Sequence, residues 1–313
     1  MSCTKQESLE SKVDTTSVLK TINEKEYRFE NNRVTELTAD LDTIATYGVL
    51  SDIHGEVHKA QVMAQEFKKR GVDGIIITGD ISLNEPLRTG AVDTRDDENE
   101  IKEVLEVVAT TGVPIYVIPG NHEMKEAYQE AVKAVSLLYT NIIDMTRYRI
   151  IDGDDADLLS LPGYQTKTIP GHQFIPDDGY FAFPKEIEKL ASLRQGLDNS
   201  VILITHGCGK TNAVWGPATT YNGRDVGDVL TTQVMAQNNI SFAVCGHIHE
   251  AGGRAATFEG KEIQSGEWAL QFSANFGTLE RWTYLHGETY DSMAGILTVN
   301  GTKAKYEIVV LGK

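Results

Sequence analysis

The stretch "ISFAVCGHIHE", residues 240–250, ends an apolar run with a glycine and then places two histidines one residue apart. The apolar part is typical of a buried strand, so His247 and His249 would follow the point where a strand ends. A pair on the surface would need no explanation, whereas a buried pair needs partners. Because histidine is the commonest metal ligand, a metal ion is the partner we expect. The rest of the chain must then supply the other ligands.

Four further apolar runs end in the same kind of polar residue. They are "IATYGVLSDIHGE" (residues 44–56), "VDGIIITGD" (residues 72–80), "VPIYVIPGNHE" (residues 113–123) and "SVILITHG" (residues 200–207), and they end on Asp52 and His54, Asp80, Asn121 and His122, and His206. One such run alone would be an ordinary turn, but five equivalent coincidences indicate a shared site. In open α/β sheets, functional residues gather just beyond the carboxyl ends of the strands.

Segments with apolar residues at helical spacing lie between these strands, at residues 57–71, 98–112, 124–139 and 224–239. Strands that alternate with helices predict an α/β fold with largely parallel sheet and helices on its faces. Residues 268–277 and 294–313 are expected to be closing strands, the latter with a turn at Asn300 and Gly301. We expect residues 1–40 to be a polar tail or edge decoration. Residues 41–313 would form one domain, with a cap or loop insertion at residues 150–184, which are rich in Gly, Pro and Asp.

The 313 residues carry a formal net charge of −16. A general binder of nucleic acid or of anionic membranes would show basic patches, so the acidic balance disfavours both partners and a nuclease of long DNA or RNA. It does not disfavour a small phosphorylated substrate, because bound metals reverse the sign of the field locally. No apolar run approaches the length that spans a bilayer. The sequence does not indicate an oligomeric state.

Three cysteines do not predict a disulfide framework, which fits a reducing compartment such as the cytoplasm. Cys208 and Cys245 flank the metal-ligand segments and are interpreted as small residues packed near strand ends, although a redox role is conceivable. Cys3 would be a lipid-attachment site if an upstream signal had been trimmed, and we favour a free cysteine in a polar tail.

The polar residues at the strand ends combine carboxylates, an amide oxygen and imidazoles, without a thiolate. Such ligands suit Mn, Fe, Zn, Co or Ni, and not a structural zinc cage of cysteines. There are more ligands than one ion needs, so we expect two metal ions, with one carboxylate bridging them about 3.5–4 Å apart. An H-x-H pair on an extended segment can then point one imidazole at each ion.

With the motifs "SDIHG", "GDIS", "GNHE", "THG" and "GHIH" in this order over residues 48–250, the chain resembles the calcineurin-like metallophosphoesterase superfamily. The resemblance implies two facing mixed β-sheets flanked by helices, with two metals (Mn, Fe or Zn) at one end of the sandwich. It assigns Asp52, His54, Asp80 and His249 to one metal, and Asp80, Asn121, His206 and His247 to the other, with Asp80 bridging. It implies that His122 is a catalytic residue, which stabilises the transition state or protonates the leaving group after attack by a metal-bridging hydroxide.

The chain departs from the superfamily's protein Ser/Thr phosphatases, which follow the bridging aspartate with Asp-Arg-Gly. Here "GDISLNEPLRTG" continues with Ile81 and Ser82, which makes protein dephosphorylation doubtful. The chain looks closer to the Icc-like branch of small phosphodiesterases, so we expect a small phosphodiester as substrate. A phosphomonoesterase and a non-catalytic metal-binding interaction protein remain alternatives.

Several loop residues near the ligand segments could contact the substrate. His172 and Arg224 are the favoured ones, because cationic groups suit a phosphate. The others are Tyr164, Trp215, Asn222 and Arg254.

Overall fold

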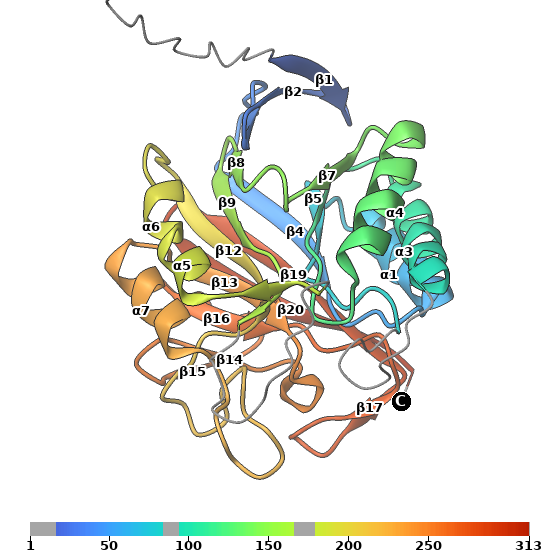
Figure 1. Cartoon of the computed structure of the whole chain (residues 1–313). Helices are drawn as coiled ribbons and strands as arrows, with labels where there is room; N and C mark the ends of the chain where they lie inside the picture. The colour runs from blue at the N-terminus through green and yellow to red at the C-terminus, as the bar shows by residue number, and fades with distance from the viewer. Residues whose placement is uncertain (1–16, 84–93, 166–178, 313) are drawn as a thin grey trace, which may run out of the picture.

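The computed structural model describes residues 17–83, 94–165 and 179–312. In these residues two mixed sheets dominate the fold (Figure 1). The smaller has the strand order β20-β19-β4-β5-β6-β7. Its strands are β20 (Lys303–Leu311), β19 (Ser292–Asn300), β4 (Ile44–Leu50), β5 (Gly74–Ile77), β6 (Ile115–Val117) and β7 (Ile142–Asp144). Strands β4 to β7 run parallel, while β19 pairs antiparallel with β4 and β20.

The larger sheet has the strand order β1-β2-β3-β8-β9-β12-β13-β16-β14-β15. Its strands are β1 (Val18–Ile22), β2 (Lys25–Glu30), β3 (Arg33–Glu36), β8 (Ile150–Asp152), β9 (Ala156–Leu161), β12 (Ser200–Gly207), β13 (Phe242–Gly246), β16 (Phe272–Asn275), β14 (Ala255–Ala256) and β15 (Glu262–Ile263). Its centre, β9-β12-β13-β16, is parallel and buried on both faces.

The two sheets face each other across one core and carry helices on their outer faces (Figure 1). The shared core joins residues of both sheets, such as Val49 and Ile76 with Ile204 and Val244. Helices α1 (Val57–Lys69), α3 (Thr94–Ala109) and α4 (Lys125–Leu138) cover the smaller sheet. Helices α5 (Pro184–Glu188), α6 (Leu190–Leu193) and α7 (Val229–Gln237) cover the larger one. The expected sandwich of two facing mixed sheets flanked by helices is therefore confirmed.

Short sequence patterns predicted most of these elements. Helix α7 begins later than the apolar pattern suggested, because the Asp228 side chain caps it by accepting from the Thr231 N–H. The hairpin of β19 and β20 is confirmed, but Asn300 still pairs with Lys303, so its turn is Gly301 and Thr302, one residue later than expected. Short strands β10 (Tyr164–Gln165) with β11 (Phe181–Ala182), and β17 (Trp282–Thr283) with β18 (Thr289–Tyr290), form two small ribbons. The 3-10 turn η1 (His249–Ala251) follows β13.

Two segments differ from the expectation. The range 1–40, described from residue 17, contains three edge strands that add a meander to the larger sheet. Burial there alternates, with Tyr27, Phe29 and Val34 packed into the core. Strands β8 and β9 are part of the larger sheet, so residues 150–161 are not a cap or insertion. The sequence hid β9 because it is buried on both faces and so lacks a period. Within the described ranges, no helix is long and apolar enough to cross a membrane.

Candidate dinuclear metal centre

The polar residues at the strand ends come from both sheets. Asp52, Asp80 and Asn121 follow β4, β5 and β6 of the smaller sheet, whereas His206 and His247 lie at the ends of β12 and β13 of the larger one. The loops are held in register by backbone hydrogen bonds, such as those from the Asp52 N–H to Gly79 O (3.0 Å) and from the His54 N–H to Asp80 O (3.0 Å). The carboxyl ends of strands in two facing sheets therefore meet at one place.

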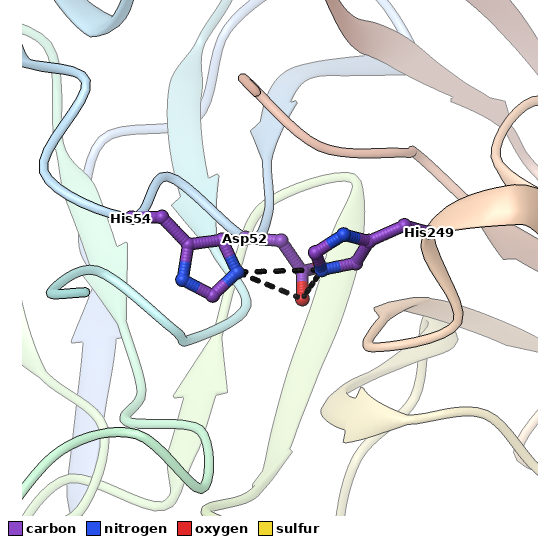
Figure 2. Close-up of side chains that lie close together, drawn as sticks. All are labelled: Asp52, His54 and His249. Atoms are coloured by element: carbon purple, nitrogen blue, oxygen red, sulfur yellow. Dashed lines mark hydrogen bonds and ion pairs between the residues drawn. The ribbon is translucent and has the colours of Figure 1, made fainter. Parts of the chain in front are cut away.

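The first cluster consists of Asp52, His54 and His249 (Figure 2). The Nε2 atoms of His54 and His249 face each other at 3.3 Å, and His249 Nε2 lies 3.2 Å from Asp52 Oδ1. His54 Nε2 lies 4.0 Å from the same oxygen. The ligand atoms of all three side chains point into one space, although 197 residues separate Asp52 from His249.

The second cluster consists of Asp80, His206 and His247, with Asn121 beside it. His206 Nε2 lies 3.1 Å from Asp80 Oδ2, 3.1 Å from Asn121 Oδ1 and 3.2 Å from His247 Nδ1. The other ring nitrogen, His206 Nδ1, lies 3.1 Å from Thr78 O. A proton on Nδ1 would satisfy this carbonyl and leave the Nε2 lone pair for a metal, as second-shell partners of ligand histidines commonly do.

The spacing of these donor atoms fits metal ions. An ion with bonds of about 2.1 Å holds neighbouring ligand atoms about 3.0–3.4 Å apart, and the shortest donor separations of both clusters, 3.1–3.3 Å, lie in this range, while His54 Nε2 and Asp52 Oδ1 are wider apart at 4.0 Å. Two imidazole nitrogens that face each other at 3.3 Å also need either a proton or a cation between them. The nitrogen and oxygen donors suit first-row transition metals. The residues present therefore fit two metal ions, one for each cluster.

The backbone around the clusters is strained in a way that the sequence does not reveal. Asp52, His54, Asp80 and His247 have φ values of 47°, 48°, 51° and 66°, in the left-handed region that side chains rarely adopt. Close packing of the loops helps to enforce this: a Cβ on Gly120 would lie 2.1 Å from Asp80 Oδ1. Strained residues persist only where their surroundings over-determine them, so the fold holds the ligand side chains in fixed directions.

A buried carboxyl group ties the loops after β5 and β6 together. Glu123 accepts hydrogen bonds from four backbone N–H groups: those of Ile81 and Ser82 at Oε1, and those of Asp80 and Gly120 at Oε2. Glu123 is fully buried. Burial, then the carboxylates of Asp80 and Asp97, raise its pKa to about 8, and the four donors offset part of the cost of its charge.

Burial and mutual charges set the protonation states of the second cluster. Burial alone would lower the pKa of His206, but the carboxylate of Asp80 outweighs it and raises this pKa to about 9. Burial and the charge on His206 lower the pKa of His247 to about 3. Despite burial, His206 and its neighbours hold the pKa of Asp80 well below its usual range. At neutral pH the Asp80 carboxylate is thus ionised and His247 is neutral, as metal ligands must be, whereas His206 carries a proton that a bound metal would displace.

His122 lies between the two clusters. Its ring packs edge-on against His54 at a centroid distance of 4.7 Å, and its Nε2 lies 3.7 Å from Asp80 Oδ2. Its backbone N–H donates to Asp80 Oδ1 (3.0 Å). The side chain keeps 12% of its surface exposed, so it borders both clusters and the solvent.

Only some of the residues expected to contact the substrate line a cavity beside the clusters. Tyr164 and Arg224 line a cavity together with His247, and the Tyr164 ring packs on the His247 ring at 4.1 Å. His172 lies outside the described residues. The remaining expected contacts are not among the described residues that line this cavity; they are Trp215, Asn222 and Arg254.

Two residues near the first cluster were missed by the sequence. Glu280 Oε2 lies 4.0 Å from His54 Nε2 and 3.9 Å from His249 Nδ1, and the Trp282 ring packs edge-on against His249 at 4.6 Å. Both follow β16 in a segment without a motif, and only the fold brings them to the centre.

Cys208 and Cys245 are packed near the strand ends, as expected, but they also form a disulfide, which the sequence analysis did not predict. Strands β12 and β13 are parallel neighbours in which Gly207 pairs with Gly246, and this places the two Cα atoms 5.2 Å apart. The bond joins the strand ends that carry His206 and His247. Disulfides persist in oxidising compartments, so the cysteine count no longer supports a reducing one. Cys3 lies outside the described residues.

Comparisons with known proteins agree with this geometry. The family model for calcineurin-like phosphoesterases matches residues 45–251. Among solved structures, TT1561 of Thermus thermophilus is similar, with 12% identity, a TM-score of 0.54, and coverage of 82% of this chain and 99% of its own. A dimetal phosphatase from Danio rerio has 11% identity, a TM-score of 0.50, and coverage of 87% and 99%. A sequence comparison with curated proteins finds no match. The family match covers most of the chain and its five motifs, and the chain therefore belongs to the calcineurin-like phosphoesterase family, whose members are metal-dependent hydrolases.

Proposed function

We propose that the protein hydrolyses a small phosphodiester at the paired clusters of Asp52, His54 and His249 and of Asp80, His206 and His247. The proposal rests on one observation: two groups of three ligand side chains converge, each with the spacing to hold one ion, and His122 lies beside both. Family membership supports a phosphoric ester hydrolase and candidate sites for two metals. The ester type and the metals, Mn, Fe or Zn, are part of the proposal.

Each cluster would hold one metal ion, with Asn121 completing the second set and Asp80 shared between them. When bound, the two ions supply positive charge that polarises a phosphoryl group and makes water a nucleophile at neutral pH. The protein contributes the rigid placement of the donors. The His206 ring is held by Thr78 O, and the His247 backbone by a hydrogen bond from its N–H to Asp52 Oδ2 (2.9 Å).

His122 is the proposed catalytic residue. Its ring borders the space between the clusters without completing either set of close donors. From there it can donate a hydrogen bond to a phosphoryl oxygen and a proton to the departing oxygen. Such a role requires access to the substrate, which the partial exposure of the side chain supports.

A small diester of the Icc-like kind is favoured over a phosphoprotein. Protein phosphatases of this superfamily place an arginine shortly after the bridging aspartate. Here the positions after Asp80 hold Ile81 and Ser82, both fully buried, with backbone N–H groups bound to Glu123. They cannot present a cation to a phosphoprotein.

The substrate class is tested by steady-state hydrolysis of bis(p-nitrophenyl) phosphate and p-nitrophenyl phosphate after loading with Mn²⁺. We expect a higher kcat/KM for the diester. Preference for the monoester would replace the proposal with a phosphomonoesterase. Absence of turnover on both, in protein shown to hold two metals, would favour the non-catalytic binding protein.

The residue roles are tested by two variants and a matched control. His122→Ala is expected to keep both metals and lose at least 100-fold in kcat, within the usual contribution of general acid catalysis of about 10²–10⁴. Asp80→Ala should lose both metals, because it removes the shared ligand. His58→Ala, which changes an exposed histidine on α1, should behave like wild type. An unimpaired His122→Ala enzyme, or full metal content in Asp80→Ala, would contradict the respective role.

A further inference from the structure

A cavity of about 410 Å³ opens beside the second cluster, with His247 in its wall. Tyr164, Ile248, Lys210 and Arg224 also line it. The loop after β12 is joined to the segment before α7 by hydrogen bonds from the Lys210 N–H to Asp228 O (2.9 Å) and from the Asp228 N–H to Cys208 O (3.1 Å). The cavity has the size of a small-molecule site and is continuous with the metal centre.

The acidic side chains that line the cavity have hydrogen-bond partners, whereas the basic ones do not have any among the described residues. Asp225 Oδ2 accepts from the Thr211 N–H, and its Oδ1 from the Gly227 N–H. Asp228 Oδ1 caps α7. The side chains of Lys210 and Arg224, in contrast, are exposed and make no ion pair or hydrogen bond with the described residues. Two cations that have no partner within residues 17–83, 94–165 and 179–312 therefore line a cavity in a protein whose net charge is −16.

We propose that this cavity binds a second anionic group of the substrate, a phosphate or a carboxylate, through Lys210 and Arg224. The inference rests on the proposed function and names its substrate class: phosphate esters that carry another anion beyond the scissile phosphorus, on the His247 side of the centre. Arg224 presents a planar fork that suits either oxyanion, and Lys210 adds a mobile point charge. The Tyr164 ring supplies an apolar wall for the organic part between the two anions.

The test uses three chromogenic diesters that release the same p-nitrophenol: p-nitrophenyl phenyl phosphate and its analogues with a 4-carboxyl or a 4-phosphono group on the phenyl ring. For the Mn²⁺-loaded enzyme we expect kcat/KM to be at least tenfold higher for one or both anionic analogues than for the neutral diester. The better of the two identifies the anion. The ratio should fall at least threefold in Lys210→Gln and in Arg224→Gln, and should decrease with added salt because the interaction is electrostatic. Lys133→Gln, an exposed cation on α4, is the matched control and should keep the wild-type ratio.

Calorimetric binding of phenyl phosphate and 4-carboxyphenyl phosphate to the same Mn²⁺-loaded protein gives a readout without turnover. Tighter binding of the carboxylated compound, lost in Arg224→Gln, supports the site even if the diesters are poor substrates. Hydrolysis of all three diesters with equal kcat/KM in wild type and both variants would overturn the anion site and leave the proposed function intact. Absence of any hydrolysis, together with a binding preference, would instead overturn the proposed function and keep the anion site.

Discussion

Gly246 is the position where the structure makes the sharpest prediction for the metal centre. It ends β13 immediately before His247, and its φ lies outside the left-handed region, so an alanine is not excluded by the backbone. A Cβ at this position would, however, lie 1.8 Å from Ser51 Oγ and 2.1 Å from Asp52 Oδ2. Both atoms belong to the loop after β4, in the opposite sheet. Gly246→Ala therefore pushes apart the two strand ends that build the first cluster.

The size of the effect follows from these contacts. Each atom must retreat by more than about 1 Å to reach ordinary van der Waals contact. The bond from the His247 N–H to Asp52 Oδ2 (2.9 Å) breaks, and the 3.2 Å approach of His249 Nε2 to Asp52 Oδ1 lengthens. Metal sites tolerate deviations of about 0.2 Å. We expect metal affinity to fall at least tenfold, in line with losses of about 10–100-fold when second-shell support is removed, and stability to fall by about 1–3 kcal/mol from overpacking.

The assay is titration of the metal-free variant with Mn²⁺ or Zn²⁺ in a metal buffer, followed by urea unfolding in EDTA. Gly287→Ala is the control: Gly287 has φ 85°, and a Cβ there meets nothing within 4 Å. An alanine in this left-handed conformation costs about 1–2 kcal/mol but clashes with nothing, so the Gly287→Ala protein should lose stability and keep its metal affinity. A Gly246→Ala protein with wild-type metal affinity would refute the reasoning from close approach.

Three further predictions concern stability, each measured by urea unfolding. Replacing Cys208 and Cys245 with alanine opens a cross-link over 37 residues and should lower the unfolding free energy by about 4 kcal/mol under non-reducing conditions; equality with the unreduced wild type would contradict this. Glu123→Ala leaves four backbone N–H groups without their acceptor and should cost at least about 2 kcal/mol, with loss of metal affinity; an unchanged midpoint would show that water replaces the carboxyl group. Burial and Asp152 raise the pKa of Asp157 to about 6, so its contribution to stability is present below about pH 4 and lost as the pH rises through 6, by up to about 3 kcal/mol. The stability of Asp157→Asn relative to wild type should therefore rise between pH 4 and pH 6, and a constant difference would count against the raised pKa.

Local patterns were sufficient where an element is amphipathic or ends in a recognisable turn. The spacing of apolar residues predicted α1, α3 and α4, and Asn300-Gly301 predicted the last hairpin. They failed where burial is uniform, as in β9, whose six residues are all buried and show no period. They also failed in β1 to β3, where short strands carry charged residues on one face.

The sequence by itself determined the family and the residues from which a metal centre can be built, because strand, turn and ligand are encoded within a few neighbouring positions. The polar residues after β4, β5, β6, β12 and β13 are visible in this way. Only the tertiary structure decided which of them meet. Asp52 and His249 are 197 residues apart, and their 3.2 Å contact exists because two sheets pack face to face and bring their strand ends to one edge. The pairing of β12 with β13 inside the larger sheet brought Cys208 and Cys245 together, and the fold also brought Glu280 to the first cluster and placed Lys210 with Arg224 around one cavity. No short sequence pattern predicts any of these features, because each depends on how close two distant segments come in the folded chain.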